Sequence, residues 1–368
     1  MNVSFCGDVC LVSGIGASVV FVCTSLKMLC LQKTKDCIEI CEMVNGKAKQ
    51  GKPVFYSPLI RENAMNKVDN LTTLFKGHTE TLKSRLRVSG EDLEGAIGIL
   101  QDGREPDPTT NAQQTKAFWA LRKLKHSLLT SEMDIRGSKQ SFKLNAIPDK
   151  KSDWPGTFCI LGPSGSGKTY WLVQMIKQHW TRTTPANRRK VIWCSSEVFI
   201  DKTLHILTDL KRFEEWWVPV DISITAGRES GLSPEDFWLQ MVEPKIDHAR
   251  DSIICWDDPQ DSWCPNQCRV AIDRGLRCGR HSNNSTIAIF HSIRNGLWTR
   301  QCLQSCKHTI LFCRAQKGRV RDFFKDFLGL TMNESRDLVT LLQDCGRATC
   351  IRLHNPVCII AEKYLRLL

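Results

Sequence analysis

Short apolar runs recur through the second half of the chain, separated by polar stretches that are long enough for helices. Continuous apolar runs of this length are typical of strands buried on both faces, as in parallel sheets. The pattern predicts an α/β fold with a mainly parallel central sheet flanked by helices, and it places any ligand at the carboxyl ends of the strands. The predicted strands are residues 158–161, 190–195, 252–256, 286–290 and 308–313, with one or two more in 350–360.

The first half of the chain lacks this alternation and reads as a mostly helical extension. Residues 116–129 are basic and carry apolar residues at helical spacing, which indicates a packing helix. Cysteine usage also divides the chain: six of the 18 cysteines precede residue 42, none lies in 42–158, and twelve follow. We therefore expect a hydrophobic N-terminal segment (1–41), a helical extension with a linker (42–149) and a motor-sized domain (150–368).

Residues 9–26 form an uncharged stretch of marginal length for a membrane helix. Several glycines, serines and a threonine dilute it, and no basic region precedes it, which weakens a secretory-signal interpretation. Lys27, Lys33 and Lys35 follow it, so an inserted helix would leave the rest of the chain on the cytoplasmic side. Two interpretations stay open, a membrane helix and an N-terminal helix that is buried elsewhere.

The strongest chemical signal is a complete phosphate-binding loop, G-x-x-x-x-G-K-[ST], between a predicted strand and a predicted helix. Its glycines let backbone N–H groups turn toward phosphate, and the start of the helix favours an anion. Lys168 supplies positive charge, and Thr169 supplies a hydroxyl for Mg²⁺. We expect ATP to be held by Gly162, Pro163, Ser164, Gly165, Ser166, Gly167, Lys168 and Thr169.

A second catalytic element ends the strand at 252–256, where two carboxylates follow the apolar run. This is the pattern of a Walker B element. Asp257 is predicted to hold Mg²⁺ through water, and Asp258 to orient and deprotonate the attacking water. Eighty-nine positions separate Lys168 from Asp257, which leaves room for a strand and a helix between the two catalytic strands.

Positive charge is concentrated rather than spread evenly. The chain has 51 Lys and Arg against 39 Asp and Glu, a formal charge of +12. No acidic residue lies between Arg274 and Arg321, while ten basic residues do, counting both ends. Such a run suggests contact with a polyanion such as the DNA backbone, although a solvated basic face has the same appearance.

Spacing disfavours two other types of site. Cys264, Cys268, Cys278 and His281 have irregular spacing for a zinc site, and a chain of this size with a nucleotide loop is expected to keep its cysteines as free thiols. Residues 66–69 read Asn-Lys-Val-Asp, as in a guanine-binding motif, but the accompanying Asp-x-x-Gly is missing.

With these motifs in place, the chain resembles the viral genome-packaging ATPases of the FtsK–HerA superfamily, the type found in poxviruses, other large DNA viruses, virophages and polinton-like elements. The resemblance covers about residues 150–365. It rests on paired acids at the end of a strand, a Gly279-Arg280-His281 turn, a strand from Thr286 to His291, and Arg300 ahead of the next apolar strand. The first 115 residues match no known family.

The resemblance implies a ring, a hexamer in the first instance, that grips double-stranded DNA through its backbone and packages it into a capsid, in an infected cell or at a virion vertex. ATP would lie between subunits, and Arg280 or Arg300 would reach the neighbour's γ-phosphate. His291 occupies the sensor position where the family usually has glutamine. A histidine that only caps the core is the other interpretation of that residue.

Other functions remain open at this stage. A membrane-tethered DNA or phage-extrusion pump of the same superfamily depends on residues 9–26 forming a membrane helix. A replicative helicase or a P-loop regulatory ATPase is disfavoured by the long interval between the two catalytic elements and by the Gly-Arg-His turn.

Overall fold

The structure is a computed structural model that describes residues 2–6, 9–14, 17–22, 29–30, 38–45, 52–56, 75, 79–107, 109–136, 140–144, 147, 149–151, 155–209, 211–293, 296–354 and 356–368. It divides into two compact units. The first comprises residues 1–41 and 52–135, and the second comprises residues 42–51 and 136–368.

The N-terminal apolar segment forms strands, not the helix that we predicted for residues 9–26. Val9–Gly14 (β2) pairs with Ala17–Val22 (β3), and Asn2–Cys6 (β1) adds a third antiparallel strand. The segment is rich in valine, which favours strands, and the pairing register runs from Val9–Val22 to Gly14–Ala17. No helix in the described part of the chain is long and apolar enough to cross a membrane.

The first unit also contains the helices expected of the extension: Thr79–Leu86 (α3), Gly90–Gln101 (α4) and Ala112–Met133 (α5). Phe118 and Leu121, on the predicted packing helix, are buried in a small core with Leu93 of α4. Ser89 caps α4 by accepting a hydrogen bond from the Asp92 amide, as expected of a serine at this position. The same unit holds the short strands Leu29–Cys30 (β4) and Lys52–Tyr56 (β6).

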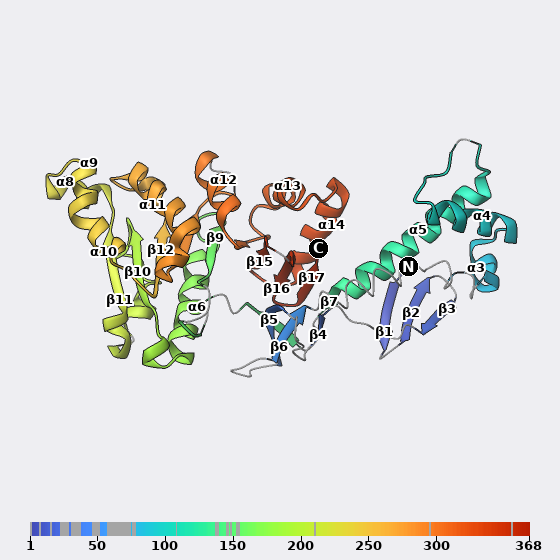
Figure 1. Cartoon of the computed structure of the whole chain (residues 1–368), viewed down its shortest axis with the longest axis horizontal. Helices are drawn as coiled ribbons and strands as arrows, with labels where there is room; N and C mark the ends of the chain where they lie inside the picture. Colours follow the sequence, from blue (N-terminus) through green and yellow to red (C-terminus); the bar gives the residue numbers. More distant parts are fainter. Residues whose placement is uncertain are drawn as a thin grey trace. The chain divides into compact units, whose positions relative to one another are not determined.

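The second unit is built on a large sheet whose parallel part has the order β11-β10-β12-β13-β9-β14 (Figure 1). All of the predicted strands are present. The sequence analysis missed β11, a short edge strand that contains Pro219, and proline is tolerated at a sheet edge. The parallel strands are Thr157–Leu161 (β9), Lys190–Ser195 (β10), Trp217–Asp221 (β11), Ser252–Asp257 (β12), Ser285–Phe290 (β13) and His308–Leu311 (β14).

An antiparallel extension continues the sheet beyond β14. Thr349–Arg352 (β15), Cys358–Ala361 (β16) and Tyr364–Leu367 (β17) follow one another as neighbours. Gln140–Lys143 (β8) pairs with the second half of Ile38–Asn45 (β5), and the Phe142 amide donates a hydrogen bond to the Glu362 carbonyl at the end of β16. The strand Asp134–Arg136 (β7) lies at the boundary between the two units.

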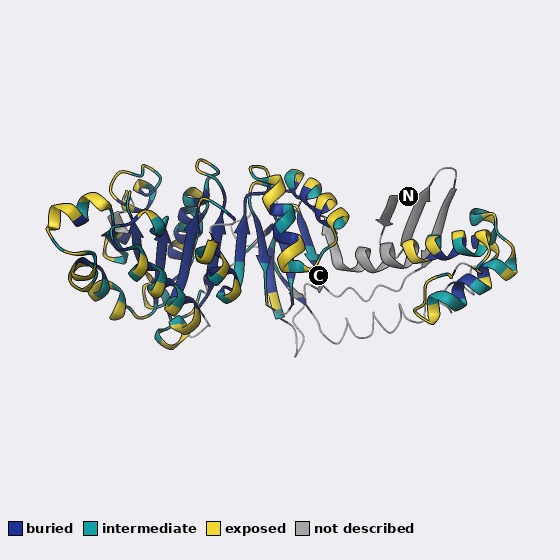
Figure 2. Ribbon diagram, turned by 90° about the horizontal axis from the view of Figure 1, so that it is seen from above, coloured by how far each residue is buried: buried dark blue, intermediate teal, exposed yellow. Residues whose placement is uncertain are grey.

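Helices cover both faces of the parallel strands. Every residue of β9, β12 and β13 is buried, which requires a cover on each face (Figure 2). One face packs against a core that includes residues of α11, α12, α13 and α14. The helices are Lys168–Arg182 (α6), His205–Thr208 (α7), Ile224–Ser230 (α8), Pro234–Phe237 (α9), Glu243–Asp247 (α10), Pro265–Cys278 (α11), Gly296–Ser305 (α12), Lys317–Leu328 (α13) and Met332–Asp344 (α14).

The helix that starts at residue 234 has a clear N-terminal signal in the sequence. Ser233 accepts a hydrogen bond from the Asp236 amide, and Pro234 occupies the first helical position. The α-helix stops at Phe237, and Trp238–Val242 continues it as a π-helix. Short 3-10 turns complete the unit: Pro185–Asn187 (η1), Lys211–Trp216 (η2), Pro259–Asp261 (η4) and Gly279–Ser282 (η5).

Candidate nucleotide site

The predicted phosphate loop joins β9 to the first turn of α6. Gly165 and Gly167 have φ values of +71° and +94°, which side chains rarely adopt, and Gly167 is the N-cap of α6. A Cβ on Gly162 would lie 2.9 Å from Ser166 Oγ and 3.2 Å from the Phe312 side chain. Backbone conformation and space therefore both require glycine in this loop, and the free N–H groups at the start of α6 favour an anion.

Lys168 is buried at the base of the loop, with 5% of its surface exposed. Its Nζ donates hydrogen bonds to the Pro163 carbonyl (3.1 Å) and to His291 Nδ1 (2.9 Å). Burial lowers the pKa of Lys168, and the negative charges of Asp258 and Asp257 oppose that shift. The ammonium group is thus held where the loop would receive phosphate, by groups that a phosphate can replace.

Three strand ends bring the catalytic candidates together. In the sheet, β13 lies between β9 and β12, so the loop after β9, His291 after β13, and Asp257 at the end of β12 share the carboxyl edge. Thr169 Oγ1 lies 3.5 Å from Asp257 Oδ2. A hydroxyl and a carboxylate are hard oxygen ligands of the kind that Mg²⁺ prefers, so this pair fits the predicted metal position.

Asp258 has a left-handed backbone, with φ 47° and ψ 52°, which aspartate tolerates better than most residues. Its amide donates a hydrogen bond to the Ile289 carbonyl (3.2 Å). Its Oδ2 lies 2.6 Å from His291 Nε2. Since Lys168 can only donate to His291 Nδ1, the neutral His291 carries its proton on Nε2 and donates it to Asp258.

Asp257 is buried and Asp258 is partly buried, and too little positive charge lies near them. Burial, and then the charge of Asp258, raise the pKa of Asp257 to about 8, while Lys168 opposes the shift. Burial also raises the pKa of Asp258, and the neighbouring His291 and Lys168 oppose that shift. The folded site therefore favours binding of a cation, and a bound Mg²⁺ would supply the charge that keeps both acids ionised.

The predicted arginines do not join this group. Arg280 lies in η5, the turn that precedes β13, and therefore at the amino edge of the sheet. Arg300 is an exposed residue of α12. Arg319, in the first turn of α13, donates a hydrogen bond to Ser292 Oγ, next to His291.

One residue that contacts the loop was not predicted from the sequence. Arg347 follows α14 and precedes β15, and its Nε donates a hydrogen bond to the Ser166 carbonyl at 2.8 Å. The two residues are 181 positions apart. No motif marks Arg347, and only the pairing of β15 with β14 brings it to this edge.

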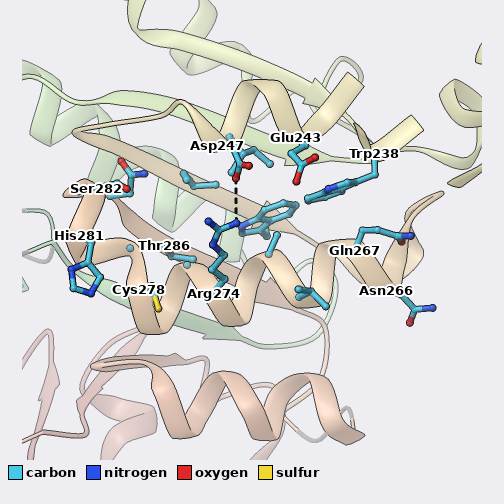
Figure 3. Close-up of a pocket in the computed structure, with 18 residues that line it drawn as sticks. Trp238, Glu243, Asp247, Asn266, Gln267, Arg274, Cys278, His281, Ser282 and Thr286 are labelled. Atoms are coloured by element: carbon cyan, nitrogen blue, oxygen red, sulfur yellow. Dashed lines mark ion pairs between the residues drawn. The ribbon is translucent and has the colours of Figure 1, made fainter. Parts of the chain in front are cut away.

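A pocket of the second unit lies elsewhere, between α10 and α11 over strands β12 and β13, with a volume of about 670 Å³ (Figure 3). Trp238 and Trp256 stack beside it, and Arg274 points across it to Asp247 at 3.6 Å. It contains none of the loop residues. The nucleotide site is therefore identified by the backbone conformation of the phosphate loop and not by this pocket.

Neither alternative site gains support. Within the described residues, no group of three or more His, Cys, Asp or Glu side chains is placed to hold a metal ion. Cys264 and Cys268 are buried, free and 4.0 Å apart, whereas Cys278 is exposed. The guanine-type motif at residues 66–69 lies outside the described residues.

Comparisons with solved structures find proteins with nucleotide-binding folds. The genome-packaging NTPase B204 from Sulfolobus turreted icosahedral virus 2, in complex with ATPγS, is 14% identical, and the match covers 57% of this chain and 97% of that one, with a TM-score of 0.36. The pCW3 conjugation coupling protein TcpA, in its monomer form with ATPγS, is 12% identical over 62% of this chain and 64% of that one, with a TM-score of 0.37.

A KaiC-like protein from Pyrococcus horikoshii OT3 is 14% identical over 45% of this chain and 77% of that one, with a TM-score of 0.30. No protein-family model matches the chain, and no curated protein matches it. The packaging NTPase is of the class that the sequence resembles. The P-loop NTPase fold itself follows from the strand order and from the loop between β9 and α6.

Proposed function

We propose that the chain is an ATP-hydrolysing DNA translocase, and that it packages double-stranded DNA into a viral capsid. The observation that supports the ATPase most directly is the arrangement at the carboxyl edge. Lys168 and His291 hydrogen-bond to each other, His291 contacts Asp258, and Thr169 faces Asp257. These are the groups needed to hold a triphosphate with Mg²⁺ and to direct a water at the γ-phosphate.

In this proposal, Lys168 leaves His291 and the Pro163 carbonyl to bind the β- and γ-phosphates. Thr169 and Asp257 would hold Mg²⁺, whose charge stabilises the negative charge of the transferred phosphoryl group. Asp258 accepts the proton of the attacking water, and His291 donates a hydrogen bond that keeps this carboxylate in position. Polar contact between His291 and the γ-phosphate would then report whether ATP or ADP is bound.

The DNA part of the proposal rests on charge. The run from Arg274 to Arg321 has ten basic and no acidic residues, and part of it is carried by the exposed surfaces of α11, α12 and α13. Contacts from such residues to the DNA backbone give affinity without sequence preference. A ring with ATP between subunits, in which Arg280 or Arg300 reaches the neighbouring site, would couple hydrolysis to movement.

The membrane-tethered pump loses its basis, because β2 and β3 occupy most of the segment that it required as a helix. The translocase is tested by ATP hydrolysis with and without double-stranded DNA, for the wild-type protein and Lys168→Ala. We expect DNA to stimulate hydrolysis and the variant to be inactive. Equal turnover with and without DNA, together with no ring in the presence of nucleotide, would refute the translocase.

A further inference from the structure

Arg347 approaches the phosphate loop closely on the side of the antiparallel extension. A Cβ added to Gly167 would lie 2.8 Å from the carbon and from one Nη atom of the Arg347 guanidinium group. Together with the 2.8 Å hydrogen bond from Nε to the Ser166 carbonyl, this places the guanidinium group against the last two residues before Lys168. Gly167 is therefore required by its φ value and also by the space that Arg347 fills.

The turn that carries Arg347 is fixed by the C-terminal hairpin. Gly346 has a φ of +140°, and a Cβ there would lie 2.8 Å from the Glu362 side chain between β16 and β17. The Lys363 amide donates a hydrogen bond to the Cys345 carbonyl (2.9 Å). Contacts at Gly346 and at Cys345 thus position the following Arg347 on the sheet extension, so the approach to the loop is built into the fold.

The guanidinium group keeps most of its hydrogen-bonding capacity. Arginine has five N–H donors, and among the described residues Arg347 uses one of them, the Nε–H, on a main-chain carbonyl. Its side chain is exposed, unlike that of Lys168. Within the described residues, no carboxylate forms an ion pair with it. A fixed, solvated positive charge therefore stands at the rim of a loop whose ligand is a polyanion.

We propose that Arg347 is a second nucleotide-binding cation, which contacts the phosphates of a nucleoside triphosphate bound in its own subunit. It complements Lys168, which acts from the base of the loop, and it is distinct from an arginine supplied by a neighbouring subunit. The inference rests on the proposed function only in that the loop binds a nucleoside triphosphate. Through Arg347, the antiparallel strands β15–β17 become part of the nucleotide site.

The test measures the affinity of the full chain for Mg²⁺–ATP and Mg²⁺–ADP in the wild type, Arg347→Ala, Arg347→Lys and Arg336→Ala. Arg336 is a matched control, an exposed arginine of α14 that makes no contact with the loop. A hydrogen bond between charged groups of this kind corresponds to a loss of about tenfold or more in affinity when it is removed. We expect that loss for Arg347→Ala, a smaller one for Arg347→Lys, and none for Arg336→Ala.

Two further measurements distinguish a contact between Arg347 and phosphate from a purely structural role in holding the loop backbone. Because Arg347 is exposed, the difference in affinity between wild type and Arg347→Ala should shrink in about 0.5 M salt, and the melting temperature without nucleotide should be the same for both proteins. A salt-independent difference, or a lower melting temperature without nucleotide, would mean that Arg347 only braces Ser166, and would overturn the inference.

Unchanged ATP affinity in Arg347→Ala would also overturn it while leaving the translocase intact. The converse outcome is distinguishable: if DNA fails to stimulate hydrolysis but Arg347→Ala still weakens ATP binding, the translocase fails and the nucleotide contact stands. A wild-type chain that binds no nucleotide would refute both.

Discussion

The two edges of the parallel sheet differ in the like charges that they bring close together. At the carboxyl edge, Asp257 and Asp258 are crowded together, and the pKa of Asp257 rises to about 8 because of burial and then the charge of Asp258. At the amino edge, the pKa of Lys307 is lowered by burial and then by the charges of Arg352 and Arg280. Each edge gathers like charges at a cost in stability, which indicates that each is built to meet an opposite charge.

For the carboxyl edge, the fitting partner is a nucleotide with its magnesium ion. Under the proposed function, the amino edge would meet an anion from outside the subunit, either the DNA backbone or the phosphates of a nucleotide on a neighbouring subunit. ATP is therefore hydrolysed, under the proposed function, at the carboxyl edge of one subunit, and the amino edge of a second subunit assists the reaction. Variants at each edge test this assignment of roles to the two edges.

Arg280→Ala tests whether the amino edge serves a neighbour. If Arg280 is the arginine that stabilises the γ-phosphate in trans, its loss should reduce the turnover number by about 10³–10⁵. The measurement is steady-state ATP hydrolysis by Arg280→Ala, by Lys168→Ala and by their mixture. The mixture should regain activity, since some interfaces then combine an intact loop with an intact arginine.

Arg300→Ala is the comparison variant, because Arg300 lies on α12 and not in the turn before β13. Loss of activity only in Arg300→Ala would move the trans contact to that helix. If neither Arg280→Ala nor Arg300→Ala regains ATP hydrolysis when it is mixed with Lys168→Ala, the amino edge does not serve the nucleotide site of a neighbour.

Asp258→Asn tests the chemistry assigned to the carboxyl edge. Asparagine keeps the shape of the side chain but cannot take a proton from water, so turnover should fall by about 10²–10⁴ while ATP still binds. Single-turnover hydrolysis and nucleotide affinity are the measurements. Asp261→Asn is the control, an acidic residue of the same turn that is exposed. Similar losses in both variants would mean that Asp258 is an ordinary acidic turn residue.

The candidate catalytic groups at the carboxyl edge were predictable because each one follows an apolar strand. Such runs mark buried strands whatever the details of packing, and parallel strands bring their carboxyl ends together. The strand that ends at Asp257 and the strand that precedes His291 were located in this way. The contact between His291 and Asp258 follows because β12 and β13 are neighbours in the sheet.

Other features depended on contacts that no local pattern reveals. Arg347 reaches Ser166 only because β15 pairs antiparallel with β14. The prediction for the N-terminal segment was wrong because its length and lack of charge suited a helix, whereas its valine-rich halves pair as antiparallel strands. Local composition therefore predicted the buried parallel strands well and the antiparallel parts poorly.

His291 variants test the link between the two halves of the catalytic site. Glutamine, the usual residue of the family that the chain resembles, can still donate to Asp258 or to a phosphate, so His291→Gln should keep turnover within about tenfold of wild type. His291→Ala breaks both contacts and should lose about 10–100-fold, as expected when a hydrogen bond to a charged group is removed. Hydrolysis at saturating ATP distinguishes the two. Equal activity in all three proteins would mean that His291 merely caps the core.

The smallest effect is on stability, and it has opposite signs at the two edges. Burial and the charges of Arg189, Arg188 and Arg182 lower the pKa of buried His179, which hydrogen-bonds the Arg189 amide ahead of β10, to about 3. Between about pH 3 and 6.5 the unfolded chain binds the proton and the folded chain does not, so this residue makes stability fall as pH falls.

Asp257 acts in the reverse direction. Its pKa is about 3.8 in the unfolded chain and about 8 in the folded one, so the folded protein holds the proton between these values and loses stability as pH rises. Without nucleotide and Mg²⁺, Asp257→Asn should therefore be more stable than wild type at pH 8, by up to a few kcal/mol, and equal to it near pH 4. His179→Gln should flatten the loss below pH 6.5 and leave the alkaline side unchanged. Urea unfolding from pH 4 to 8.5 measures both slopes, and a single common slope in the two variants would show that the edges are not electrostatically distinct.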